Sequence, residues 1–151
     1  MTPLMVKGTL FGLLLLSAAV WDMRNREIPN LIPILLFLCG LIGFRPAAST
    51  AGLLLVGGPF LLAAVLIKRD GFAIGGGDVK LMAVCGLLLG WELIIFAFLL
   101  GCIIGSVIHL IRMKVSGEGH VLAMGPYLSA GVAIAVLWGN EFLQWYLNFY
   151  L

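Results

Sequence analysis

The sequence predicts an all-α, polytopic membrane protein with about six transmembrane helices, and three observations lead to this fold class. Hydrophobic residues make up 62% of the 151 positions, and the mean hydropathy is +1.15. Charged residues make up 11%, about half the fraction found in ordinary soluble domains. Apolar runs recur along the chain, with polar residues gathered in short breaks between them, as in membrane loops. A soluble domain of this size would need more polar surface, so we expect the bilayer to be the main solvent.

Six apolar runs give the expected helices: residues 3–21, 31–44, 51–67, 79–90, 93–111 and 121–139. Helices are favoured over a barrel because the runs are long and do not alternate. A span needs roughly 20 apolar residues, so the second and fourth runs are short. We expect these two segments either to be extended by the uncharged neighbours Ile28–Asn30 and Phe72–Gly77, or to lie sheltered within the bundle. Trp91 and Glu92 separate the fourth run from the fifth.

The first run has an alternative interpretation as a cleaved signal peptide with a small-residue cleavage site at Ser17–Ala19. Arg24 and Arg26 follow it immediately, and basic residues there resist translocation. We therefore expect the first run to be retained as a helix. The whole chain, residues 1–151, is expected to form one transmembrane domain without a soluble domain.

Orientation follows from the basic residues. Seven of the nine lie in or beside the first, third and fifth breaks, whereas Lys7 and Arg45 lie toward the other side. The positive-inside tendency places those three breaks in the cytoplasm and both termini outside. The net charge of +2 is scattered between apolar runs, so we expect a bilayer around the protein and no nucleic acid as a partner.

Cysteines and glycines point to packing rather than to a bound metal. Cys39, Cys85 and Cys102 lie inside apolar runs and form no Cys-x-x-Cys pair, so we expect no metal and no cofactor. Three glycine pairs with small-xxx-small spacing predict close helix packing in lipid: Gly8/Gly12, Gly86/Gly90 and Gly101/Gly105. The C-terminal stretch 140–151 combines aromatic and polar residues, which is typical of the interface at the outer membrane surface.

Two aspartates lie at matched depth on the predicted cytoplasmic side. Asp22 ends the first run, and Asp78 opens the fourth run after three glycines. Separately, Asp22 can be a solvated loop residue and Asp78 a helix N-cap. An acid at the hydrocarbon boundary is costly and usually functional, however. Two converging carboxylates share a proton, and such a pair can hydrolyse a peptide bond by general acid–base catalysis.

Three motifs carry a family resemblance. "GGGDVK" (residues 75–80) resembles the Gly-x-Gly-Asp-x-Lys motif of the type IV prepilin peptidases, which are intramembrane aspartyl proteases. "DMRNREIPN" (22–30) resembles their first motif, and "AMGPYLSAG" (123–131) is similar to the glycine-proline-aromatic start of their last conserved helix. The resemblance implies that Asp22 and Asp78 are the catalytic pair. It also implies an active-site loop, formed by Gly75, Gly76, Gly77 and Lys80. The substrate-binding positions that it implies are Ile28, Pro29, Asn30, Gly125, Pro126 and Tyr127.

The function implied by the resemblance is removal of the short basic leader of type IV prepilins or pilin-like precursors. Cleavage would occur at the cytoplasmic face of the bacterial cytoplasmic membrane. Larger family members carry an extra cytoplasmic domain, usually with a cysteine-rich zinc site, and also N-methylate the product. This sequence shows no such cysteines, so we expect the peptidase-only form.

Two alternatives remain at this point. A presenilin-like protease shares Gly-x-Gly-Asp, but its other aspartate follows tyrosine, whereas Asp22 follows Trp21, and its Pro-Ala-Leu motif is missing here. A small channel or transporter subunit, or a pilus-assembly scaffold, can also carry intramembrane acids. A transporter is expected to place polar groups near the membrane midplane, whereas the acids here cluster toward one surface.

Overall fold

The computed structural model describes residues 3–41, 45–66, 76–116 and 123–150, and this part of the chain folds into six helices without strands. In chain order they are α1 (Pro3–Asn25), α2 (Leu31–Leu41), α3 (Pro46–Leu66), α4 (Gly76–Leu89), α5 (Trp91–Ser116) and α6 (Gly125–Tyr150). The all-α prediction with six helices is confirmed.

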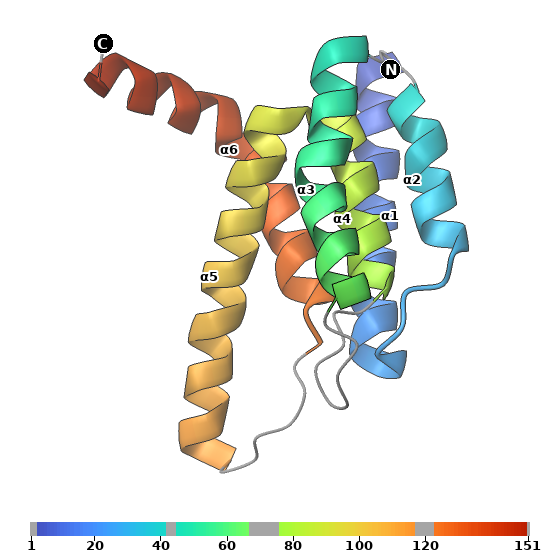
Figure 1. Cartoon of the computed structure of the whole chain (residues 1–151), viewed down its shortest axis with the longest axis vertical. Helices are drawn as coiled ribbons and strands as arrows, with labels where there is room; N and C mark the ends of the chain where they lie inside the picture. Colours follow the sequence, from blue (N-terminus) through green and yellow to red (C-terminus); the bar gives the residue numbers. More distant parts are fainter. Residues whose placement is uncertain (1–2, 42–44, 67–75, 117–122, 151) are drawn as a thin grey trace.

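The helices run alternately up and down (Figure 1). The end of α1, the start of α2 and the start of α4 lie at one end of the bundle, together with the end of α5 and the start of α6. We call this the lower end, after its place in Figure 1. The alternation agrees with the predicted order of breaks, and it brings the Asp22 and Asp78 segments to the same end.

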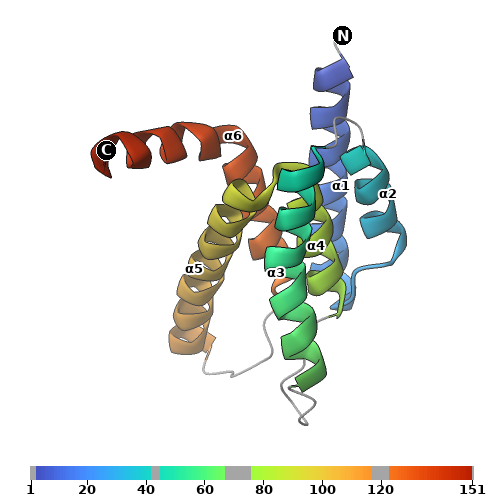
Figure 2. The ribbon, with the colours of Figure 1, turned by 45° about the horizontal axis from the view of Figure 1, so that its top comes forward.

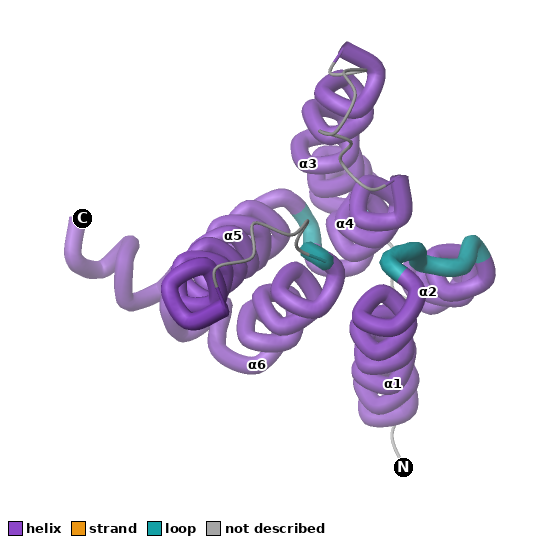
Figure 3. Tube along the Cα trace, turned by 90° about the horizontal axis from the view of Figure 1, so that it is seen from below, coloured by secondary structure: helices purple, strands orange, loops and turns teal. Residues whose placement is uncertain are grey.

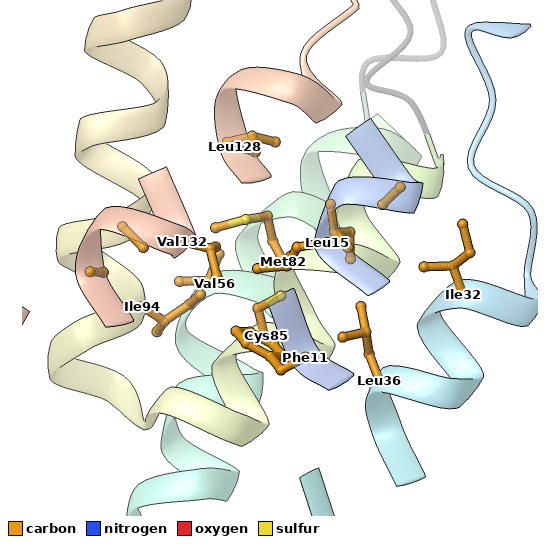
Figure 4. Close-up of a cluster of buried hydrophobic side chains, with 14 of the residues drawn as sticks. Phe11, Leu15, Ile32, Leu36, Val56, Met82, Cys85, Ile94, Leu128 and Val132 are labelled. Carbon is orange, nitrogen blue, oxygen red and sulfur yellow. The ribbon is translucent and has the colours of Figure 1, made fainter. Parts of the chain in front are cut away.

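Helix α4 is the central element of the bundle. It contacts α2, α3, α5 and α6, and half of its residues are buried. Its side chains Met82 and Cys85 lie in the middle of the apolar core, which receives side chains from all six helices (Figure 4). With 14 residues, α4 is about 21 Å long, less than the ~30 Å of a bilayer core. The short fourth run is thus sheltered inside the bundle, which is one of the two alternatives that the sequence predicted for it.

Membrane-spanning character is clearest for α5. Among the described residues, one helix, Trp91–Val115, is both long and apolar enough to cross a membrane by its length and composition, and α2 is a shorter apolar helix. The idea that Ile28–Asn30 extend α2 is wrong, because the helix begins at Leu31. Pro29 disfavours helical backbone at Ile28, and the first helical hydrogen bond of α2 runs from the Ile34 N–H to the Asn30 carbonyl at 3.2 Å.

Close backbone contacts hold two helix pairs together. Gly86 of α4 faces Gly52 of α3, and Gly131 of α6 faces Ala97 and Gly101 of α5, so closely that a Cβ atom at Gly52, Gly86 or Gly131 would overlap the opposing backbone. A Cβ at Gly101 would be in tight contact, 3.0 Å from the Leu128 Cα atom. The predicted close packing is therefore confirmed at Gly86 and Gly101. At Gly90 and Gly105 a Cβ would meet the neighbouring helix at ordinary contact distances, 3.5 Å from Ala48 Cβ and 3.4 Å from Tyr127 Cδ2, so close packing does not require glycine there. The prediction for Gly8/Gly12 is wrong, because no atom of another element lies within 4 Å of where their Cβ atoms would be.

Two helix ends are set by unusual backbone. Gly90 has a φ of 84° and ends α4 just before Trp91 opens α5, which confirms that the fourth and fifth runs are separate helices. Arg26 has a φ of 56°, and its N–H donates to the Asp22 carbonyl at 2.8 Å. This left-handed residue ends α1 and leaves Asp22 in its last turn.

The second half of α6 runs away from the bundle, crosswise to the other helices (Figure 2).

Candidate active site

Asp22 is held in the last turn of α1 with its side chain turned inward. Phe11, Leu15 and Ala18 precede it on the buried face of the helix, and Asp22 continues that face with 5% of its surface exposed. The spacing of three or four residues between them corresponds to one helical turn at each step. The same apolar stripe that packs α1 into the core therefore carries the carboxylate into the bundle. Because α1 is part of the core, the structure disfavours the cleaved signal peptide.

The start of α6 meets this carboxylate. The backbone N–H of Gly125 donates to Asp22 Oδ2 at 3.0 Å. The next residue, Pro126, has no N–H, and the N–H groups of Tyr127 and Leu128 donate to the Met124 carbonyl. Gly125 therefore offers the free donor of this helix start, and the helix dipole adds favourable potential for a negative charge there. A Cβ on Gly125 would lie 2.6 Å from Asp22 Oδ2, so the approach requires glycine.

Asp78 lies in the first turn of α4, and 9% of its surface is exposed. Its Oδ1 atom is buried and has no hydrogen-bond partner among the described residues. An N-cap carboxylate would accept a hydrogen bond from its own helix. The simple capping interpretation therefore does not account for Asp78, whereas a buried carboxyl with a free oxygen is poised to meet a substrate or a water molecule.

The two carboxyl groups belong to helices whose backbones are not in contact. Their charges interact electrostatically, yet no Cα atom of α1 comes within 8 Å of a Cα atom of α4 among the described residues. Seen from the lower end, the end of α1 and the starts of α4 and α6 lie around a common point (Figure 3). The two carboxyls thus lie near enough for one charge to act on the other, while the backbones of their helices stay apart.

The residues around Asp78 join α4 to the chain that precedes α2. Lys80 Nζ donates to Asn30 Oδ1 at 2.7 Å. A Cβ on Gly77 would lie 2.9 Å from Ile28 Cβ, so the first turn of α4 packs tightly on this segment. Ile28 is buried, Pro29 is half-buried and Asn30 is exposed.

One of the remaining expected site residues lies outside the described part of the chain, and the others lie in the first turns of α4 or at the start of α6. Gly75 lies outside the described residues. Gly76 is exposed, and nothing lies within 4 Å of where its Cβ would be. Gly76, Gly77 and Lys80 are helical rather than part of a loop, because α4 begins at Gly76. Tyr127 packs its ring on Gly105 of α5, and Pro126 is half-buried beside it.

Sequence reasoning did not single out Ser129. Its hydroxyl is buried one turn after Gly125 and has no hydrogen-bond partner among the described residues. The hydroxyl within "AMGPYLSAG" was the available sign, because a serine in an apolar helix near a functional motif carries a polar group that must be satisfied. Within the described residues, no group of three or more His, Cys, Asp or Glu side chains could hold a metal ion.

Comparison with known proteins places the chain in a family. Residues 9–110 match the model of the type IV leader peptidase family. Three similar proteins are each named prepilin leader peptidase/N-methyltransferase. The protein from Bacillus subtilis (strain 168) is 33% identical over 93% of this chain and 59% of its own length. Those from Aeromonas salmonicida (strain A449) and Pseudomonas aeruginosa are each 29% identical, over 93% and 89% of this chain and 53% and 50% of their own lengths.

The chain thus spans about half the length of the curated relatives it matches. No solved structure gives a significant match. The family match covers α2, α3 and α4 completely, together with most of α1 and α5, so it includes both aspartates and the Asn30–Lys80 contact. On this evidence the chain belongs to the type IV leader peptidase family, a family of membrane proteins.

Proposed function

We propose that this protein is a membrane-embedded aspartyl endopeptidase that removes the leader of type IV prepilins or pilin-like precursors. The observation that carries the proposal is the pair of buried carboxyl groups at the lower end of the bundle, Asp22 from α1 and Asp78 from α4, whose charges interact across a gap between their backbones. The names of the relatives support the substrate class. Membership of a peptidase family removes the support for a channel or scaffold.

The two aspartates have different surroundings, and these suggest different roles. Both carboxyls are buried, which disfavours their charge. Asp22 accepts the Gly125 N–H at the positive end of α6, and this bond offsets part of that cost, so Asp22 is the better suited of the two to be ionised. Asp78 is buried with an unpartnered oxygen, which favours its protonated form. In our proposal Asp22 takes a proton from the attacking water, and Asp78 gives its proton to the oxygen of the scissile carbonyl. Return of a proton to the leaving nitrogen then breaks the carbon–nitrogen bond.

The site lies at the lower end of the bundle, the end that the basic residues place in the cytoplasm. We propose that all six helices are embedded in the bacterial cytoplasmic membrane, with α2 and α4 sheltered by their neighbours. A precursor would then present its basic leader to the aspartates from the cytoplasm, while its apolar helix remains in the bilayer.

The proposal is tested by co-expressing the protein with candidate pilin-like precursors and measuring the precursor mass. Asp22→Asn and Asp78→Asn are each expected to slow cleavage by at least about 100-fold, because an amide cannot cycle a proton. Glu92→Gln is the matched control, since this exposed acid lies in the first turn of α5, at the opposite end. Cleavage at a near wild-type rate in either aspartate variant, with insertion confirmed, removes that residue from the mechanism.

Methyl transfer is a separate question, because the names of the relatives include both activities. We propose that this chain cleaves without methylating. The measurement is transfer of labelled methyl groups from S-adenosylmethionine to the new amino terminus by the purified protein. Incorporation that depends on this protein alone contradicts the proposal.

A further inference from the structure

The contact between Asn30 and Lys80 joins two segments that lie 50 positions apart in the sequence. The Lys80 ammonium donates to Asn30 Oδ1 at 2.7 Å, and both side chains are exposed. An exposed hydrogen bond of this kind adds little to overall stability. The main effect of this bond is therefore to hold the two segments that it joins in a fixed arrangement.

Asn30 is free to accept this bond because its own helix does not need it. An asparagine just before a helix usually caps the N–H groups of the second or third helical residue. In α2 the second of these residues, Ile32, donates to the Pro29 carbonyl at 3.1 Å. The third, Pro33, has no N–H. The amide oxygen of Asn30 is thus available to Lys80, and their hydrogen bond connects the first turns of α4 to the residue that precedes α2.

Lys80 is directed away from Asp78. Residues two positions apart in a helix point about 200° from one another, whereas Gly77 and Lys80, three positions apart, share a face. Gly77 packs on Ile28, and Lys80 binds Asn30. The α2-facing side of α4 is therefore fixed at two points one turn apart, and Asp78 projects from the other side.

We propose that Asn30 and Lys80 are positioning residues that fix the rotation of α4 about its axis and thereby set the gap between the Asp78 and Asp22 carboxyls. A carboxyl about 5 Å from the helix axis moves by roughly 2 Å when the helix turns by about 20°. A displacement of this size is costly, because misplacing a reacting group by 1 Å can reduce the rate by about 100-fold. The proposal rests on the aspartyl peptidase function proposed above.

The kinetic test uses Lys80→Met, Asn30→Leu and the double variant. Each single change is expected to lower kcat by about 10-fold to 100-fold with little change in KM. The double variant should be no more than about twofold worse than either single variant, because both changes break one contact. Asn30→Asp keeps an acceptor oxygen and should retain nearly the wild-type kcat. Lys114→Met, which removes an exposed charge at the same end, is the matched control.

Three kinetic results would overturn the proposal: independent, multiplying losses in the double variant, a change in KM with kcat unaffected, or an Asn30→Asp variant as slow as Asn30→Leu. A KM effect would instead make Lys80 a substrate contact.

A second measurement does not depend on cleavage. The three native cysteines are replaced by alanine, cysteines are placed at positions 22 and 78, and the protein is crosslinked in membranes. A direct disulfide is not expected, because the Cα atoms are more than 8 Å apart. Bifunctional reagents with spans up to about 10 Å should link the pair. Lys80→Met or Asn30→Leu should reduce the yield of the shortest effective reagent several-fold, and Lys114→Met should not.

The two measurements separate the two proposals. Crosslinking that responds to the Asn30 and Lys80 variants, in a protein that cleaves no precursor, supports the positioning contact and contradicts the function. Active cleavage with crosslinking that ignores these variants contradicts the positioning contact alone.

Discussion

Gly125 shows how a residue without a side chain can be indispensable to the site. Its N–H donates to Asp22 Oδ2, and a Cβ there would overlap the same carboxylate. Gly125→Ala should therefore lower kcat by about 100-fold, because the methyl group must displace Asp22 or the start of α6. The check is precursor cleavage in membranes that contain equal amounts of inserted protein. Activity within twofold of wild type would show that the carboxylate tolerates the shift.

Two neighbouring glycines offer a matched comparison. A Cβ at Gly77 would lie 2.9 Å from Ile28 Cβ, whereas at Gly76 it would meet open space. Alanine should thus impair cleavage at position 77 and be tolerated at position 76, where it also favours helix formation. Initial cleavage rates of the two variants provide the measurement. Equal losses, or a greater loss at position 76, would contradict the described packing.

The proposed proton sharing predicts a bell-shaped dependence of kcat on pH. At low pH both Asp22 and Asp78 are protonated, so no base remains to activate water. At high pH both are ionised, so no acid remains to protonate the carbonyl oxygen. The two limbs belong to the pair rather than to one residue. A rate that stays flat to the highest pH at which the protein remains folded would rule out a protonated aspartate in the mechanism.

The sequence identified the two acids but not their immediate partners. Asp22 and Asp78 stand out because a carboxyl beside an apolar run is costly. The Gly125 donor is separated from Asp22 by 103 positions, and no local pattern encodes such a contact. Asn30 stays a predicted substrate-binding position, and its side chain accepts a hydrogen bond from Lys80 that no sequence pattern indicated. Such pairings depend on helix rotation, which is decided by packing across the whole bundle.

Among the elements, α6 departs furthest from the sequence expectation. Residues 121–139 were expected to be helical, whereas α6 begins at Gly125 and continues to Tyr150. The half of α6 that leaves the bundle carries a row of aromatic residues. Phe142 stacks on Phe96 of α5 with 4.7 Å between the ring centroids, and the ring of Trp145 lies next to that of Phe142. The aromatic residues of this half are also largely exposed, at Trp138, Phe142, Trp145, Tyr146 and Phe149.

This composition supports the predicted location of the 140–151 stretch at the membrane interface, where aromatic rings with polar neighbours are favoured. A nitroxide label at Trp145 should therefore report the depth of the lipid headgroups, on the face opposite the aspartates. Power-saturation measurements with polar and apolar relaxation agents provide that depth. A label at the bilayer centre, or one fully exposed to water, would contradict the interfacial location.

At the scale of the whole molecule, the alternation of the helices supports the proposed function, because it gathers the two acids at one end. Reporter fusions test the orientation of that end. A fusion after Arg45, between α2 and α3, should report the outside, and one after Lys114, near the end of α5, should report the cytoplasm. The opposite pair of signals would invert the protein and place the proposed site on the wrong side for a cytoplasmic leader.

Hydropathy predicted the number and order of helices well because each helix needs an apolar run. It could not set their boundaries, since turns depend on single residues such as Arg26 and Gly90 with positive φ. The small-xxx-small spacing failed for Gly8 and Gly12, because spacing alone does not tell which face of a helix meets a neighbour. Gly86 and Gly101 have the same spacing pattern and do lie at helix contacts.

The bond from Gly125 to Asp22 also imposes an order of events during synthesis. Ribosomes build the chain from its amino terminus, so both aspartates have been made well before the helix that supplies the donor. A nascent chain ending in α5 would hold Asp22 without the N–H and the helix dipole that favour its charge. Helix α6, which is made after both aspartates, therefore completes the surroundings of Asp22, and the proposed site can become competent only once α6 has been made and packed.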